Sequence, residues 1–425
     1  MSAPAAPTEK LYWSDVHALA FTTRGAALGA YGGKASLVLP QTLFYPEGGG
    51  QLGDLGTLAI GDHRVPIADT QVDGGVIHHV LGAPLPGELA ELLAGAASSS
   101  LEVRGAVDEA RRRDHMVQHT AQHALSRALA DAARADTVSA RLGLGSCTID
   151  VSKPGIADAD LHRAEDLANA VVMGDVAVLT TFPTPEELAT LALRKAPNAE
   201  KSAAGVRVVA IEGFDLSPCG GTHCSRTGQI GQIRIVATEK YKGMLRLTFH
   251  AGRRALADAR ARHDMLAGLA GELTCGPQDV AAAVTKLRAE TKALREKLES
   301  SRTELAELVA GRALAALPPT PGPHVLPLAR ALDDLSGLRA LANELTKDPR
   351  VVALVGGADE GSGEVVLVVQ RGADARLDCG AFLMAEARAG GGRGGGRPER
   401  AEGRFPRGTS LEALAAAARA ALPQA

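Results

Sequence analysis

Three histidines and one cysteine, placed in two short motifs, supply the side chains of a metal site. The motifs are His119-Thr120-Ala121-Gln122-His123 and Cys219-Gly220-Gly221-Thr222-His223. Histidines four residues apart lie on one face of a helix, one turn from each other, so both imidazoles can reach a single ion. Thiolate and imidazole ligands together favour zinc over magnesium or calcium. The sequence therefore predicts a zinc site whose ligands are His119, His123, Cys219 and His223.

Two neighbouring features bear on this predicted site. Gly220 and Gly221 allow a tight turn and a positive φ, so the backbone can curl until the thiolate and the imidazole of the second motif face one point. His115 extends the helical histidine series by one turn. Because four ligands are already present, we interpret His115 as a residue that supports the ligands or lies on the surface.

A third motif, Phe44-Tyr45-Pro46-Glu47-Gly48-Gly49-Gly50-Gln51, precedes both histidine motifs. Three consecutive glycines let a backbone approach a ligand closely, and this run is Gly48, Gly49 and Gly50. Hydrogen bonds to such a ligand would come from Glu47, Gln51 and Asp54. A purely structural turn is the alternative interpretation.

The spacing of apolar residues along the chain predicts the strands and helices that position these motifs. Short β-rich stretches at 35–39, 56–60 and 76–81 alternate with glycine turns and predict a small, mostly β barrel over residues 1–100. A long helix begins near residue 101 and carries His119 and His123. Further strands are predicted at 146–151, 177–181, 207–211, 232–237 and 245–250, with a helix at 158–172. Residues 101–252 are therefore predicted to form an α+β domain in which Cys219 directly follows a strand.

The motifs together resemble the free-standing alanyl-tRNA editing proteins, often called AlaX, in their long form, and the editing domain of alanyl-tRNA synthetase. The resemblance rests on Leu11-Tyr12, the glycine motif, both histidine motifs, Thr137-Val138-Ser139 with Leu142-Gly143, and Thr148-Ile149-Asp150. It implies hydrolysis, in trans, of the ester that joins serine or glycine to alanine tRNA by mistake. It also implies that zinc is held by His119, His123, Cys219 and His223.

The resemblance suggests roles for two further residues. Thr137 resembles the family threonine proposed to recognise the serine side chain. Water aligned by the Gln51 loop and by tRNA hydroxyls is one candidate for the attacking group. The zinc could activate the ester or water, or could hold the amino group of the aminoacyl moiety. Four protein ligands favour a structural or orienting ion, whereas catalysis needs a ligand to leave or the coordination sphere to expand.

The region 253–317 is predicted to be a helical hairpin or coiled coil. Apolar residues follow an a/d heptad track, and Gly276-Pro277 separates a helix at 253–274 from the next one. The track consists of Val280, Val284, Leu287, Leu294, Leu298, Leu305 and Leu308. An intramolecular hairpin and a homodimer through the same seam both fit this pattern.

The last region, 318–425, follows a proline-rich linker and resembles the C-terminal domain that alanyl-tRNA synthetase shares with DHH-type phosphoesterases. Strands are predicted at 351–356 and 364–370, and helices at 335–347 and 381–389. The glycine run at 390–396 would expose backbone N–H groups to phosphate, with charge from Arg393 and Arg397. We interpret it as tRNA-binding, with a low-complexity flexible loop as the alternative.

The composition limits the partners. A net charge of −3 argues against a globally basic nucleic-acid binder, so RNA contacts must come from local patches. Lys240, Lys242 and Arg246 form one such patch, with a solvated turn as the alternative. Five scattered cysteines argue against a disulfide framework. With no apolar run of about 18 residues and no signal-peptide pattern, we expect a cytoplasmic protein without a membrane partner.

The predicted fold class is thus α+β: an N-terminal β-barrel, a zinc-containing editing domain, a helical hairpin or coiled coil, and a C-terminal α/β domain. We expect no segment to resemble the aminoacylation core of a synthetase, because the editing module begins near residue 10, and we therefore expect no ligase activity. The competing interpretation is a zinc-stabilised tRNA-binding or regulatory protein that does not hydrolyse esters.

Overall fold

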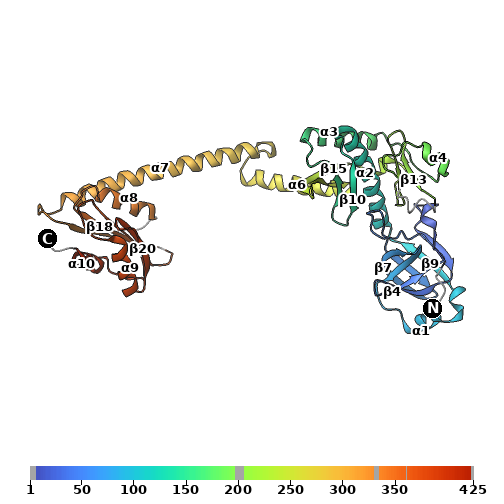
Figure 1. Cartoon of the computed structure of the whole chain (residues 1–425), viewed down its shortest axis with the longest axis horizontal. Helices are drawn as coiled ribbons and strands as arrows, with labels where there is room; N and C mark the ends of the chain where they lie inside the picture. Colours follow the sequence, from blue (N-terminus) through green and yellow to red (C-terminus); the bar gives the residue numbers. More distant parts are fainter. Residues whose placement is uncertain (1–5, 197–204, 330–334, 360, 423–425) are drawn as a thin grey trace. The chain divides into compact units, whose positions relative to one another are not determined.

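The computed structural model describes residues 6–196, 205–329, 335–359 and 361–422. The chain divides into two compact units, Met1–Gly268 and Leu269–Ala425 (Figure 1). Within the described ranges, no helix combines the length and the apolar character that crossing a membrane requires. The four-part division at residues 100, 252 and 317 stays a prediction.

The first unit opens with one curved antiparallel sheet of seven strands in the order β2-β9-β6-β7-β8-β4-β3 (Figure 1). The strands are β2 (Ala20–Arg24), β3 (Ala27–Tyr31), β4 (Lys34–Val38), β6 (Gly56–Ile60), β7 (His63–Asp73), β8 (Val76–Leu81) and β9 (Glu102–Val107). Two-residue strands β1 (Glu9–Lys10) and β5 (Gln41–Thr42) pair beside it. Helix α1 (Gly87–Ala94) buries Leu89 and Leu93 in its core.

This sheet curls almost into the predicted barrel but does not close by hydrogen bonds. Its two edge strands, β2 and β3, are consecutive in the chain and only residues 25 and 26 separate them. Gly25 has a φ of +93°, and its amide donates to the carbonyl of Leu101. The chain thus turns from one edge of the sheet to the other, and β2 and β3 pair with β9 and β4 instead of with each other.

The metal motifs lie in the rest of this unit, which is built around helix α2 (Glu109–Ala133). Asp108 caps α2 by accepting the amide of Arg111, and Arg134 ends it with a φ of +50°. Two sheets surround the helix, with orders β10-β11-β16-β15 and β12-β13-β14. Their strands are β10 (Thr137–Leu142), β11 (Cys147–Val151), β12 (Val178–Thr181), β13 (Val208–Ile211), β14 (Asp215–Pro218), β15 (Ile233–Tyr241) and β16 (Met244–Ala251).

The predicted strands after residue 140 are thus confirmed, and they belong to two sheets. Helix α3 (Asp158–Met173) confirms the helix predicted at 158–172. It packs against α2 through buried residues such as Leu161, Ala164 and Ala168. Helix α4 (Pro185–Thr190) begins with a capping box in which Thr184 and Glu187 bond each other's backbone amides. The described part of the unit continues into helix α6 (Arg253–Glu272).

The second unit contains a five-stranded sheet in the order β17-β18-β19-β21-β20, in which only β17 and β18 are parallel. Its strands are β17 (His324–Ala329), β18 (Val351–Ala358), β19 (Val365–Arg371), β20 (Arg393–Gly396) and β21 (Arg400–Phe405). Helix α8 (Leu335–Leu345) packs on one face with the end of α7 (Val280–Ala315). Helices α9 (Cys379–Ala389) and α10 (Leu411–Ala421) cover the other face. The sequence missed β17, β21 and α10.

The glycine run at 390–396 differs from the predicted phosphate-binding loop. Residues 393–396 form edge strand β20, whose backbone pairs with β21. A Cβ at Gly394 or Gly396 would collide with the backbone of β21, and one at Gly380 of α9 would contact the carbonyl of Gly396. The glycines therefore serve the close packing of α9 on the sheet. Arg393 pairs with Glu364 at 3.3 Å on the surface.

Helix α7 is a continuous helix of 36 residues that follows the predicted break at Gly276-Pro277. Six of its seven heptad residues are exposed, for example Leu294 by 65% and Leu308 by 70%, and Val280 is half-buried. Ala306 and Ala310 are buried against α8. Whether the seam serves a hairpin or a homodimer stays a prediction.

A buried ion pair fastens α2 to the glycine motif. The guanidinium of Arg112 bonds Asp54 Oδ2 through Nε at 3.1 Å and Nη2 at 2.5 Å, and also bonds the carbonyls of Val16 and Leu43. Asp54 Oδ2 accepts the amide of Tyr45 as well. The side chains of both partners are at most 1% exposed. Asp54 was predicted to bond a ligand, but its carboxylate is used inside the protein.

Replacing Arg112 by methionine is expected to lower the free energy of unfolding of the first unit by about 3–5 kcal/mol, because it leaves the Asp54 carboxylate buried and unpaired. Arg113→Met is the matched control: its ion pair with Glu109 is 71% and 58% exposed, so unfolding should hardly change. Urea unfolding followed by the fluorescence of Trp13, the single tryptophan, measures both variants. Equal effects would show that the Arg112 pair does not hold α2 in place.

Candidate metal centre

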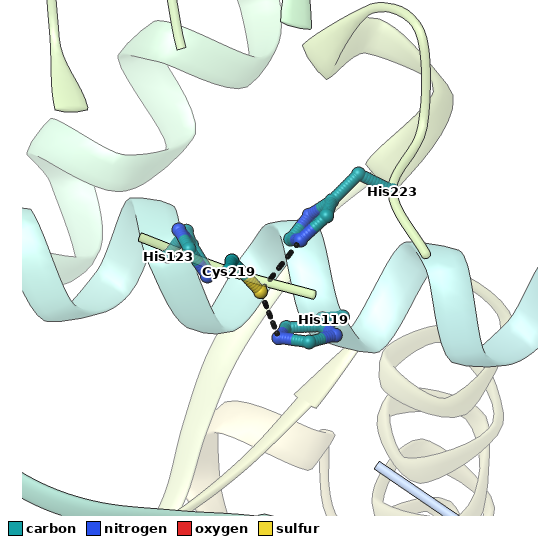
Figure 2. Close-up of side chains that lie close together, drawn as sticks. All are labelled: His119, His123, Cys219 and His223. Carbon is teal, nitrogen blue, oxygen red and sulfur yellow. Dashed lines mark hydrogen bonds between the residues drawn. The ribbon is translucent and has the colours of Figure 1, made fainter. Parts of the chain in front are cut away.

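The four predicted ligands converge, although the two motifs lie about a hundred residues apart. His119 and His123 lie on consecutive turns of α2, and Cys219 directly follows β14, as predicted (Figure 2). One donor atom from each of these residues and His223 lies within 4.8 Å of the other three. The three histidines are buried, at 2–4% exposure. The chain thus gathers one sulfur and three imidazoles around one point.

The tautomers of the three rings follow from their outer partners. His119 Nδ1 lies 2.8 Å from Gln51 Oε1, and His123 Nδ1 lies 3.2 Å from Asp215 Oδ2. Both partners are acceptors, so each Nδ1 carries the proton. His223 Nδ1 lies 3.3 Å from the hydroxyl of Thr120, whose only proton goes to the carbonyl of Met116. With a metal bound, all three rings would therefore keep the proton on Nδ1 and present an Nε2 lone pair to the centre, the metal displacing the second proton that His123 otherwise holds.

These lone pairs face the Cys219 sulfur at metal-site distances. Sγ is 3.3 Å from Nε2 of His119 and 3.3 Å from Nε2 of His223 (Figure 2). Tetrahedral zinc, with Zn–S near 2.3 Å and Zn–N near 2.0 Å, separates adjacent donors by about 3.5 Å. Lone pairs facing a thiolate repel one another, whereas a shared cation attracts all of them. The donor set therefore fits zinc, held by Cys219, His119, His123 and His223.

Charge inside the pocket supports this assignment. Burial opposes ionisation of the Cys219 thiol, but His119 and His223 outweigh it and hold its pKa well below the ordinary value. Burial also opposes protonation of His123, yet Asp215 and Cys219 raise the pKa of this imidazole to about 9. Burial and His119 lower the pKa of His223 to about 3. A thiolate and a carboxylate thus make the pocket attractive to positive charge.

The glycine motif lies against this centre through Gln51. Besides accepting from His119, Gln51 Oε1 accepts the amide of Thr222 at 3.2 Å, and Gln51 Nε2 donates to the Thr222 hydroxyl at 2.9 Å. Gln51 is fully buried. The sequence predicted that it aligns water, but its amide is bound to protein on both sides. Gln51 is therefore a positioning residue for His119 and for the second motif.

The two glycines of the second motif do not act as predicted, since neither has a positive φ. A Cβ on Gly220 would meet open space, whereas one on Gly221 would overlap Cε1 and Nδ1 of His119. Positive φ occurs in the glycine motif, at +60° for Gly49 and +86° for Gly50. Gly221 is thus required by close packing against a ligand, and Gly220 is not.

Known proteins match this chain along most of its length. A family model described as the threonyl and alanyl tRNA synthetase second additional domain matches residues 206–248, which include Cys219 and His223. Alanine–tRNA ligases of Korarchaeum cryptofilum, Pyrococcus abyssi and Methanosarcina acetivorans are 32%, 30% and 32% identical over 421, 406 and 380 residues. These alignments cover 94%, 94% and 86% of this chain.

The chain is related to the alanine–tRNA ligases. It spans less than half the length of the relatives named here, 44%, 42% and 39% respectively. A second family model, described as tRNA synthetases class II (A), matches residues 13–96. This match corrects the expectation that no segment resembles a class II synthetase. The matched residues contain the glycine motif and most of the curved sheet.

In this relative of the ligases, the metal motifs are held by three side chains that the sequence did not predict: Arg194, Asp215 and Arg207. Arg194 bonds Asp215 Oδ1 at 2.6 Å, so the carboxylate that orients His123 is itself held. Although burial opposes it, His123 and Arg194 lower the pKa of Asp215 to about 2. Arg207 donates to the carbonyls of Cys219 and Gly221 at 2.9 and 2.8 Å. Only Asp215, four residues before Cys219, carried a signal, because metal-bound histidines commonly bond a carboxylate.

His115 and Thr137 lie near the centre without joining it. His115 lies outside the four-residue cluster, is 1% exposed rather than on the surface, and has no hydrogen-bond partner for either ring nitrogen in the described part of the chain. Burial lowers its pKa to about 4. The Thr137 hydroxyl bonds the Ser126 hydroxyl at 2.7 Å, one turn beyond His123 on α2. That Thr137 recognises serine stays a prediction.

Of the predicted RNA-contacting residues, Arg246 is half-buried and the other four are exposed. Lys240 lies in β15 opposite Leu245, and Lys242 lies in the turn to β16 with a φ of +49°. The guanidinium of Arg246 is already paired inside the protein, because it bonds both oxygens of Asp150 at 2.7 and 2.9 Å. Arg397 follows β20 and bonds Arg400 through its backbone. Their contacts with RNA stay predictions.

Proposed function

We propose that this chain is a hydrolase that removes serine, and also glycine, from wrongly charged alanine tRNA, acting in trans. The observation that carries the proposal is the convergence of His119, His123, Cys219 and His223 beside the glycine motif. The kinship with alanine–tRNA ligases supports an alanine-tRNA substrate, and the match at 206–248 supports an editing role for the second motif. The free-standing editing proteins resembled by the motifs perform this reaction.

The need for such a reaction follows from binding energetics. A pocket shaped for alanine cannot strongly reject glycine, which is smaller, or serine, which adds one hydroxyl, and discriminates by about a hundredfold or less. A second site must therefore recognise the wrongly charged tRNA and hydrolyse its ester. When bound, zinc would supply a Lewis acid for the ester or for water, or would hold the free amino group. The chain's own part is to hold the four ligands through Gln51, Asp215 and Thr120.

The other proposed properties follow from the same assignment. The five cysteines are all free, which supports a reducing compartment and hence the cytoplasm. tRNA would contact the basic residues Lys240, Lys242, Arg246, Arg393 and Arg397. The exposed heptad seam of α7 supports a homodimer. A zinc-stabilised tRNA-binding protein without hydrolysis is the competing function.

The deciding experiment measures hydrolysis of seryl-, glycyl- and alanyl-tRNA of the alanine type, with zinc content determined on the same protein. We expect rapid loss of the seryl or glycyl ester and survival of the alanyl ester. Alanine-dependent exchange of pyrophosphate into ATP, measured in parallel, tests the ligase activity that the class II match raises. Bound tRNA and zinc without any deacylation would favour the competing function and defeat the hydrolase.

A further inference from the structure

An aromatic pair beside the metal loop is not used by the proposed chemistry. Aromatic residues make up only 3% of the chain, and Trp13 is its single tryptophan. The centroid of the Trp13 ring lies 5.8 Å from that of Phe182, with the planes inclined by 52°. Phe182 is 55% exposed and is the only exposed aromatic side chain among the described residues. The Phe182 ring is therefore open to contact by a ligand.

This pair is fixed to the loop that carries the metal ligands. The indole Nε1 of Trp13 donates to the carbonyl of Gly220 at 3.1 Å, and Gly220 directly follows Cys219. Arg207 holds the same loop through the carbonyls of Cys219 and Gly221, and its Nη2 bonds the Thr180 hydroxyl two residues before Phe182. The aromatic pair and the metal pocket are therefore parts of one rigid surface.

Packing beneath the pair keeps Trp13 from turning. Tyr12 is buried and stands edge-on to Trp13, with centroids 6.2 Å apart, and edge-on to Tyr45 at 5.4 Å. The Tyr45 hydroxyl donates to the carbonyl of Gly48. The Trp13 ring thus rests on an aromatic column that reaches the glycine motif. A preorganised ring loses little entropy when a second flat group stacks on it.

A lysine ammonium group lies against the pair. The ammonium of Lys10 lies 4.2 Å from the centroid of the Trp13 ring, within the range of a cation–π contact. Arg207 is 6% exposed, and its Nε has no hydrogen-bond partner in the described part of the chain. Aromatic faces with nearby cations bind unpaired nucleotides, because every base has a face to stack and every phosphate a charge to neutralise. An apolar protein segment would gain nothing from these cations.

We propose that Phe182 and Trp13 form a stacking platform for the terminal base of an unpaired RNA 3′ end. The identity of the RNA as tRNA rests on the proposed function. With the base on the platform, the ribose lies next to Gly220, and an amino acid esterified to it extends toward Cys219 and the metal. The platform then sets which ester reaches the pocket, by holding the nucleotide that carries it.

The test uses uncharged RNA and the single tryptophan. A short hairpin with an unpaired 3′ end is titrated into the full-length zinc-loaded protein, beside the same hairpin made blunt. Stacking should quench Trp13 fluorescence with the overhang and not with the blunt RNA. Phe182→Ala should weaken overhang binding about tenfold, within the range of one lost base-stacking contact, and Phe182→Tyr should restore it.

Leu179→Ala is the matched control, because Leu179 is also apolar, is 50% exposed and belongs to the neighbouring strand β12. It should leave RNA affinity unchanged, and zinc content should be normal in every variant. In the deacylation assay, Phe182→Ala should raise KM and leave kcat nearly constant. Equal quenching by blunt and overhang RNA, or equal affinity of Phe182→Ala and wild type, would overturn the platform.

The outcome for the platform is separate from the outcome for hydrolysis. Deacylation that persists with no overhang-dependent quenching would retain the proposed function and reject the platform. Overhang-dependent quenching that needs Phe182, without deacylation of any charged tRNA, would retain an RNA-end site and reject the hydrolase. A protein ligand on this surface would show as quenching that the RNA does not compete away.

Discussion

Replacement of Cys219 by alanine is expected to abolish zinc binding and the proposed deacylation together. The thiolate is the one anionic donor among the four, and it lies 3.3 Å from two of the three imidazole Nε2 atoms. Without it, three imidazole rings remain. Loss of a partner that only supports a ligand costs ten- to hundredfold in metal affinity, so loss of this ligand should cost more than about a hundredfold.

The measurement pairs zinc affinity, by competition with a chromophoric chelator, with the rate of seryl-ester hydrolysis. Cys224→Ala is the control, because Cys224 lies five residues further along, is buried and is not in the ligand cluster. Burial raises its pKa to about 11, so it stays a thiol and does not substitute for Cys219. Cys224→Ala should keep zinc and activity. Full hydrolysis by Cys219→Ala without zinc would remove the metal from the proposed chemistry.

The ligands could be predicted from sequence because all four lie in two short motifs of metal-binding residue types. His119 and His123 needed only a helix, and the long α2 provides it. Cys219 and His223 needed only a loop after a strand, and β14 ends at Pro218. What brings the motifs together could not be predicted in this way. Arg207 and Thr120 act through hydrogen bonds to residues far away in the chain, and these ordinary residue types in no special spacing give no signal.

The glycine-rich segments show the same limit for the fold. A glycine run permits a positive φ, close backbone approach, or dense packing, and sequence alone does not separate these uses. Gly49 and Gly50 adopt a positive φ. Gly394 and Gly396 lie in an edge strand under α9, where the sequence suggested a phosphate-binding loop. Tertiary packing decides between the uses, so a loop was predicted where residues 393–396 form a strand.

Gly221→Ala is the second change with a large expected effect, and it acts on the pocket without removing a donor. The added methyl group would overlap Cε1 and Nδ1 of His119 and lie 3.0 Å from Gln51 Oε1. His119 cannot turn away, because its ring is buried and Gln51 holds Nδ1 at 2.8 Å. Either the loop or the ring must therefore shift, and the Nε2 atom of His119 leaves its position opposite Cys219.

Gly220→Ala separates this steric effect from a general loss of loop flexibility. The neighbouring methyl group would meet open space, and neither glycine has a positive φ that alanine would strain. Zinc affinity should therefore stay near wild type for Gly220→Ala and fall at least about tenfold for Gly221→Ala, comparable to the loss of an outer partner of a ligand. The cobalt-substituted proteins supply a second readout, because the visible spectrum reports ligand geometry directly. A Gly221→Ala protein with unchanged zinc affinity and cobalt spectrum would show that His119 is not held against this loop, and the tautomer assignment that rests on Gln51 would fail with it.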